Sequence, residues 1–228
     1  MRQLVLDLPV EPRFGADDFL VSPSNEEAYA VLERWPDWPS PMLHLTGPRG
    51  SGKSHLAAIW AHRADAPVLQ AAQVNDEVAA ALDDVPALVL EDIDQGPLAE
   101  GALFHLVNIA RERHLPLLVT SAEPLERCGI RTPDLLSRLR LAPSALIQPP
   151  DDALLKAVLV KLFVDRQLVV DTSVVEFLAN RIERSLARAA EVVAALDREG
   201  LSRGRRITRP IAAGLIAEDE RGLGPEEP

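Results

Sequence analysis

Short apolar runs alternate with helical patterns along the chain from Phe19 to about Gln148. Five of these runs are typical of β-strands, and they are MLHLT from Met42, PVLQA from Pro67, ALVLE from Ala87, LPLLVT from Leu115 and SALIQ from Ser144. The run Leu88-Val89-Leu90 contains no polar residue, as expected for a central strand that is covered on both faces. Five strands separated by helices predict an α/β fold built on a five-stranded parallel sheet.

The pattern changes at Pro149-Pro150, after which every periodic segment is helical. A first helix is indicated by apolar residues at helix spacing, namely Leu154, Leu155, Val158, Leu159 and Leu162. Ser173 and Glu176 fit a capping box for a second helix, Ser185 can cap a third, and a fourth is expected over 210–217. We therefore expect an extended tail over 1–18, an α/β domain over 19–149, a small all-α domain over 150–218 and an acidic tail over 219–228.

Composition and charge narrow the class of protein. The 228-residue chain has 35 Asp and Glu residues against 24 Lys and Arg residues, which gives a net charge of −11. Strong electrostatic binding of nucleic acid is therefore not expected of the molecule as a whole. Cys128 is the only cysteine, which excludes an internal disulfide and a cysteine-based zinc cluster. Asp7 and Pro9 interrupt the apolar start, and no run of 18 apolar residues occurs, so a cytoplasmic protein is expected.

The strongest chemical signal lies between the first predicted strand and the helix that follows it. The segment reads Gly47-Pro48-Arg49-Gly50-Ser51-Gly52-Lys53-Ser54, with His55 next, and satisfies the pattern G-x-x-x-x-G-K-[ST]. Small residues let backbone N–H groups surround phosphate oxygens, Lys53 neutralises β- and γ-phosphate charge, and the Ser54 hydroxyl suits Mg²⁺. The sequence therefore predicts a phosphate-binding loop, with an ordinary glycine-rich turn as the alternative.

Acidic and hydroxyl residues end two of the other strands. Glu91 is placed to hold Mg²⁺ through water and Asp92 to orient an attacking water, or both acids simply end a strand. The usual order is Asp and then a longer Glu, so hydrolysis by this chain is less expected than binding. Thr120 and Ser121 either report on the γ-phosphate or start a turn.

Two arginines are candidates for contacts with phosphate. Arg138 lies in a short predicted helix before the fifth strand, and its forked, permanently charged guanidinium suits a transition-state phosphoryl group on another subunit. Arg188 follows Ser185 near the start of a helix, from which it could reach phosphates across a domain cleft. Judged by spacing alone, Arg138 is more commonly explained as an ordinary surface arginine. Judged in the same way, Arg188 is only an arginine in a helix, with no functional role indicated.

Taken together, these residues resemble the AAA+ family and, within it, the DnaA-type replication initiators. The segment from Phe19 to Asn25 is similar to the one that packs near adenine in the initiators, Ser137-Arg138-Leu139 to their arginine-finger segment, and 185–188 to their sensor II motif. The resemblance extends from about Phe19 to Ala217. It implies an AAA+ P-loop NTPase with a helical lid, ADP or ATP with Mg²⁺ as cofactors, and Arg188 among the nucleotide contacts.

The chain ends about ten residues after its last predicted helix, which leaves no room for the helix-turn-helix domain of the initiators. It therefore resembles the Hda-like branch, which represses replication initiation. Four residues of the tail, Gln3, Leu4, Leu6 and Leu8, resemble a sliding-clamp-binding hexapeptide, although Leu8 stands where an aromatic residue is often found. The resemblance implies the clamp and a DnaA-type initiator as partners, Arg138 as the group that completes the initiator's ATP site, and self-association as a homodimer.

Two other functions stay open. One is an autonomous AAA+ ATPase, such as a helicase-loading or transposition-helper protein, in which Asp92 is a working base. The other is a DNA-binding accessory protein that uses a C-terminal arginine cluster, formed by Arg198, Arg203, Arg205, Arg206 and Arg209. An exposed basic connector explains that cluster as well, so direct DNA binding is not expected. The five histidines, His44, His55, His62, His105 and His114, show no metal-ligand spacing and are expected on the surface or in packing.

Overall fold

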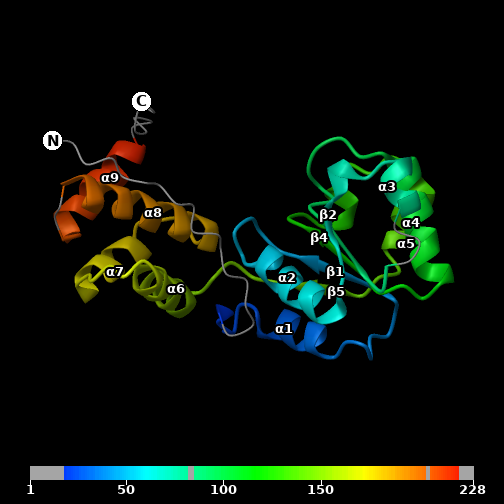
Figure 1. The fold of residues 1–228 in the computed structure, drawn as a ribbon, viewed down its shortest axis with the longest axis horizontal. Coiled ribbons are helices and arrows are strands. Elements are labelled where there is room, and N and C mark those ends of the chain that lie inside the picture. Colours follow the sequence, from blue (N-terminus) through cyan, green and yellow to red (C-terminus); the bar gives the residue numbers. More distant parts are fainter. Residues whose placement is uncertain (1–17, 82–84, 204–205, 221–228) are drawn as a thin grey trace. The chain divides into compact units, whose positions relative to one another are not determined.

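The computed structural model describes residues 18–81, 85–203 and 206–220 and divides the chain into two compact units at Pro149–Pro150 (Figure 1). The first unit is α/β. Its helices are α1 (Glu26–Glu33), α2 (Lys53–Ala64), α3 (Asp76–Ala81), α4 (Glu100–Glu112) and α5 (Pro133–Leu139), with 3₁₀ turns η2 (Ala71–Gln73) and η3 (Leu125–Arg127). Its strands are β1 (Met42–Thr46), β2 (Val68–Gln70), β3 (Leu88–Glu91), β4 (Leu117–Ser121) and β5 (Ser144–Leu146).

All five strands pair in parallel in the order β2-β3-β4-β1-β5, which confirms the predicted sheet. Helices cover both of its faces, with α1 and α2 on one side and α3, α4 and α5 on the other (Figure 1). Successive strand residues point to opposite faces. Val89 therefore packs in the core that contains Trp60 of α2, while Leu88 and Leu90 pack in the core that contains Leu106 of α4.

The pairing register brings the carboxyl ends of four strands to one level. Thr46 of β1 lies beside Ser121 of β4, and Gln70 of β2 lies beside Glu91 of β3. In an open parallel sheet, ligands bind outside the carboxyl ends of the strands. The residues that the sequence singles out at strand ends are thus gathered at the edge where a ligand is expected.

The second unit is all-helical, as predicted. It consists of α6 (Asp152–Asp165), α7 (Thr172–Ala179), α8 (Leu186–Arg203) and α9 (Arg209–Glu220). These helices share one apolar core, which includes Phe163 of α6, Leu178 of α7, Leu196 of α8 and Ile216 of α9. Within the described ranges, none of the helices in either unit has the length and apolar character needed to cross a bilayer.

Helix caps in this unit agree with the sequence in one case and differ in another. The Ser185 hydroxyl accepts a hydrogen bond from the Arg188 N–H at 3.2 Å, so Ser185 caps α8 as predicted. The capping box at Ser173 is wrong, because Asp171 is the N-cap of α7 and its carboxylate accepts from the Ser173 N–H at 2.8 Å. A carboxylate is the stronger acceptor and favours a helix N-terminus, which moves the start of the helix ahead of Ser173.

Candidate nucleotide-binding site

The loop between β1 and α2 has a backbone that only glycine accommodates at three positions. Gly50 and Gly52 have φ angles of 70° and 104°, in the left-handed region that side chains disfavour. A Cβ atom on Gly47 would overlap the carbonyl oxygen of Ile147, and the Gly47 N–H donates to the carbonyl of Ser121 at 3.3 Å. The glycines of the motif are therefore required by the path of the chain, which leads directly into the first turn of α2.

Lys53 and Ser51 are buried polar residues on this loop. The Lys53 side chain is 6% exposed, and its ammonium donates to the carbonyl oxygens of Gly47 at 2.7 Å and Pro48 at 3.1 Å. Burial lowers the pKa of Lys53, while Asp92, Asp94 and Glu91 oppose that shift. Among the described residues, the buried Ser51 hydroxyl has no hydrogen-bond partner. A buried ammonium without a directly bonded carboxylate and an unsatisfied hydroxyl both fit a phosphate ligand.

Glu91, the last residue of β3, and Asp92, which follows it, occupy different environments. Glu91 is 8% exposed, and one of its carboxylate oxygens accepts from the Gln70 amide at 3.2 Å. The other oxygen, Oε1, is buried with no partner in the described part of the chain. Asp92 follows with a φ of 55°, and its N–H donates to the Thr120 hydroxyl at 3.0 Å. A hydrogen bond thus fixes the backbone of Asp92, and Glu91 keeps an oxygen for a cation.

A Mg²⁺ site built from these residues needs oxygen ligands from phosphate as well. The described residues contain no group of three or more His, Cys, Asp or Glu side chains arranged to hold a metal ion. Mg²⁺ ordinarily uses one or two carboxylates together with water and substrate phosphates. Ser54 is exposed at the second position of α2 and Glu91 has a free oxygen, so the residues present suit a phosphate-bound Mg²⁺.

His44 of β1 connects the hydroxyl residues of the neighbouring strands, a role beyond the simple packing expected from the sequence. Its ring Nε2 lies 2.7 Å from the Ser121 hydroxyl, which itself donates to the Glu123 carbonyl. Because the Ser121 hydrogen is used in this way, Nε2 must carry the donated proton and Nδ1 must accept from Ser144 at 3.4 Å. Burial lowers the pKa of His44 to about 4, so the ring is neutral at physiological pH.

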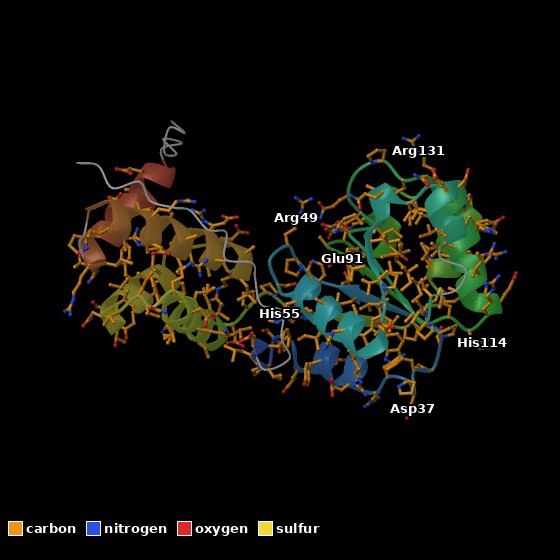
Figure 2. The ribbon with its side chains drawn as sticks, in the orientation of Figure 1. Asp37, Arg49, His55, Glu91, His114 and Arg131 are labelled. Carbon is orange, nitrogen blue, oxygen red and sulfur yellow. The ribbon has the colours of Figure 1, made fainter. Side chains whose placement is uncertain are left out.

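Aromatic side chains lie beside the start of α2. Phe19 stacks on Tyr29 with ring centroids 5.6 Å apart and meets the His55 ring edge-on at 5.3 Å. Figure 2 marks His55 at the start of α2, and Arg49 and Glu91 at the end of the sheet that carries the loop. Pro48 and Arg49 are exposed on the loop. The segment before α1 therefore contacts the helix that follows the loop, where the flat face of a base would find aromatic neighbours.

Arg138 lies on α5 and differs from the arginine two positions later. Its guanidinium stacks over the Phe104 ring of α4 at 4.5 Å from the ring centroid, and no carboxylate of the described residues pairs with it. Arg140, in contrast, donates to Glu126 at 2.8 Å. Stacking occupies the flat face of a guanidinium and leaves the N–H groups in its plane. The Arg138 guanidinium is thus positioned by stacking on Phe104, and no carboxylate among the described residues neutralises its charge.

The start of α5 is held by a residue that the sequence did not single out. The Glu100 carboxylate of α4 accepts from the backbone N–H groups of Arg131 at 2.9 Å and Thr132 at 2.6 Å. The hydrogen bond from the Thr132 hydroxyl, together with these two backbone bonds, lowers the pKa of Glu100. Gln70, whose side-chain amide donates to Glu91, is a second residue of the site that the sequence did not single out. A lone Glu or Gln at the end of an element has no sequence signal, because its partners come from a distant segment.

The remaining predicted site residues lie outside the α/β unit or outside the described residues. Arg188 belongs to the helical unit, where its guanidinium donates to Glu191 at 3.1 Å. The predicted clamp-binding residues lie outside the described residues, and they are Gln3, Leu4, Leu6 and Leu8.

Comparisons with known proteins show what the chain is similar to. Residues 152–214 match the family model described as "Hda, lid domain". The chain is 29% identical over 238 residues to the chromosomal replication initiator protein DnaA of Thermomicrobium roseum, covering 92% of this chain and 50% of that protein. Residues 152–214 are thus similar to the Hda lid domain, and most of the chain is similar to part of a DnaA protein. It spans about half the length of the relative that it matches.

Solved structures share the fold of the chain. Domain III of DnaA from Thermotoga maritima matches with a TM-score of 0.77 and 19% identity, over 93% of this chain and 98% of that one. AMPPCP-bound DnaA from Aquifex aeolicus matches with a TM-score of 0.71 and 16% identity, over 92% and 70%. A RuvB variant from Thermotoga maritima matches with a TM-score of 0.69 and 16% identity, over 90% and 72%. At these identities the likeness concerns the fold.

Proposed function

We propose that this DnaA-related protein represses replication initiation by stimulating ATP hydrolysis on a DnaA-type initiator. The observation that carries the proposal is the state of Arg138, a stacked guanidinium with no carboxylate partner among the described residues. An arginine supplied to another protein's triphosphate must be rigidly held and must keep its N–H donors for phosphate oxygens. Arg138 satisfies both requirements, whereas Arg140 is already paired with Glu126.

In this proposal the chain itself binds ADP or ATP with Mg²⁺. The N–H groups of 49–54 would surround the phosphates, Lys53 would turn from its carbonyl partners to the phosphate oxygens, and Ser54 and Glu91 would hold the cation. Bound Mg²⁺ neutralises phosphate charge. The AMPPCP-bound state of the Aquifex aeolicus neighbour supports a nucleotide at this loop. Arg188 of the lid contributes a further contact when nucleotide is present.

Binding of the sliding clamp through Gln3, Leu4, Leu6 and Leu8 belongs to the same proposal. A clamp that remains on DNA would tether the chain beside the initiator and raise the local concentration of a weak pair without new contacts. Replacing Gln3, Leu6 and Leu8 by Ala is then expected to remove clamp binding and to leave nucleotide binding unchanged. Clamp binding that survives these substitutions would exclude the hexapeptide as the anchor.

A second candidate function is an autonomous ATPase, favoured by the position of Asp92. Its charge acts on Lys53, and its backbone N–H donates to the Thr120 hydroxyl, which supports a role for its carboxylate in orienting an attacking water. The two functions differ in which protein turns over ATP. Rapid hydrolysis by the purified chain without clamp or initiator would favour the autonomous enzyme.

The test of the proposal is the rate at which initiator-bound ATP is hydrolysed when the chain is added together with DNA-loaded clamp. Stimulation that depends on the chain is the expected result. Lys53→Ala is the companion variant, because it removes the ammonium from the phosphate loop and should abolish nucleotide binding by the chain itself. Nucleotide affinity that stays unchanged in Lys53→Ala would contradict the assignment of the loop.

A further inference from the structure

The outward face of α6 carries apolar side chains that the described chain leaves open to solvent. Val160 is 48% exposed and Val164 is 66% exposed, while Val169, just beyond the helix, is 77% exposed. Ala153 and Ala157 of the same helix are exposed as well. Scattered exposed apolar residues are ordinary on protein surfaces, but a group on one helix indicates an interaction surface.

The spacing of these residues makes a continuous stripe. Ala153, Ala157, Val160 and Val164 are separated by four, three and four positions, so at 3.6 residues per turn they fall within an arc of roughly 60°. The opposite side of α6 supplies Leu155, Leu159 and Phe163 to the core of the helical unit. A helix needs only one apolar face to join its own core. The second face, defined here as the α6 stripe (Ala153, Ala157, Val160 and Val164), is available for another helix.

We propose that the α6 stripe binds an amphipathic helix of a partner protein whose apolar face is flanked by acidic residues. Lys156 and Lys161 lie on opposite edges of the stripe, each roughly 70° from its centre at 100° per residue. Lys161 also pairs with Asp165 at 2.7 Å, but Asp165 lies farther around the helix from the stripe. Charged residues at the edges of a helix pair select a partner of opposite charge. Alanine at two of the four positions lets the partner's backbone approach closely.

The same two lysines argue against a second copy of this chain as the occupant. A parallel copy would bring Lys156 of one helix beside Lys161 of the other, and an antiparallel copy would place lysines together along both edges. A lipid surface is also disfavoured. Helices that lie in a membrane interface present bulky Trp, Phe or Leu side chains, whereas the α6 stripe has only Ala and Val.

The experiment uses the full chain and two synthetic helical peptides with the same Leu and Ala stripe, one flanked by Glu and one by Lys. Fluorescence anisotropy should show the Glu-flanked peptide binding at least about tenfold more tightly than the Lys-flanked one. Val164→Ser should weaken binding of the Glu-flanked peptide by about tenfold with an unchanged melting temperature. Val21→Ser is the matched control, because Val21 is 52% exposed in the other unit, and it should have no effect.

Lys156→Glu keeps the apolar stripe and should remove most of the preference between the two peptides, because one edge of the stripe is then negative and the other positive. This provides a readout even if Val164→Ser were to unfold. Equal binding of both peptides to the original chain, or no binding at millimolar concentration, would overturn the proposal. So would self-association, or binding to phosphatidylglycerol vesicles, that is lost in Val164→Ser, because the occupant would then be a second copy or a lipid surface. The inference does not depend on the proposed function, and Arg138 takes no part in its test.

Discussion

Gly47 is the residue at which the phosphate loop accepts least change. A Cβ atom there would meet a backbone oxygen of Ile147, which cannot rotate away as a side chain would. We expect Gly47→Ala to displace the loop and to lower nucleotide affinity by at least about tenfold, since a displacement moves the N–H groups that surround the phosphates. Titration with a fluorescent ATP analogue measures the effect.

Gly214 provides a matched control for this substitution. It lies within α9, and a Cβ atom on it would have no neighbour within 4 Å among the described residues. Gly214→Ala should leave nucleotide affinity unchanged and should raise the free energy of unfolding by about 0.5 to 1 kcal/mol, because alanine loses less backbone entropy in a helix. Equal nucleotide affinities for Gly47→Ala and Gly214→Ala would show that the loop is not constrained as described.

His44 makes the free energy of unfolding depend on pH. Burial lowers its pKa in the folded chain to about 4, against 6.5 for an ordinary histidine. As the pH falls from 6.5 to 4, the unfolded chain binds a proton that the folded chain does not, so the free energy of unfolding falls by up to about 3 kcal/mol. Below about pH 4 both states are protonated, and His44 adds no further change.

His44→Phe removes this titration while filling a similar volume. Urea unfolding at pH 7 and pH 4.5 should show the original chain losing about 2 kcal/mol more than the His44→Phe variant. Other titrating groups contribute equally to both proteins and cancel in the comparison. The same loss in both proteins would mean that the ring of His44 is solvated in the folded state.

Among the helices, α6 depends on its N-cap. The Asp151 carboxylate accepts from the Leu154 N–H at 2.8 Å, which satisfies a donor that the first turn leaves without a helical partner. Asp151→Ala should lower the free energy of unfolding by about 1 kcal/mol. Asp152→Ala removes the same charge from the neighbouring position but breaks only an exposed pair with Arg184, and should cost less than about 0.5 kcal/mol. Thermal unfolding of the two variants makes the comparison, and a larger loss in Asp152→Ala would contradict the cap.

The elements differ in how far local sequence determines them. β1 occupies the predicted run MLHLT, because a short apolar run before a glycine-rich loop has no competing helical pattern. The start of α7 was not predicted correctly, because Asp171 and Ser173 are both good caps and only the three-dimensional hydrogen bond decides between them. The Gln70–Glu91 contact was not predicted, since it depends on the register of β2 against β3.

The architecture of the chain as a whole follows from its pattern more directly than its site does. Alternation of strands and helices up to Gln148, and helices alone afterwards, predicts the parallel sheet and the all-helical unit that the structure has. The loop from Gly47 to Ser54 is a local motif and could be placed on that sheet. The stacking of Arg138 on Phe104 could not, because the two residues lie on different helices and no periodicity relates them.

The central claim concerns what this protein does to another one. The direct measurement is single-turnover hydrolysis of ATP on a DnaA-type initiator, with DNA-loaded clamp, and with the original chain, Arg138→Ala or Arg140→Ala added. An arginine supplied in trans is worth roughly 10³ to 10⁵ in rate. We expect the original chain and Arg140→Ala to stimulate hydrolysis alike, and Arg138→Ala to bind nucleotide normally while losing the stimulation. Full stimulation by Arg138→Ala would contradict the account.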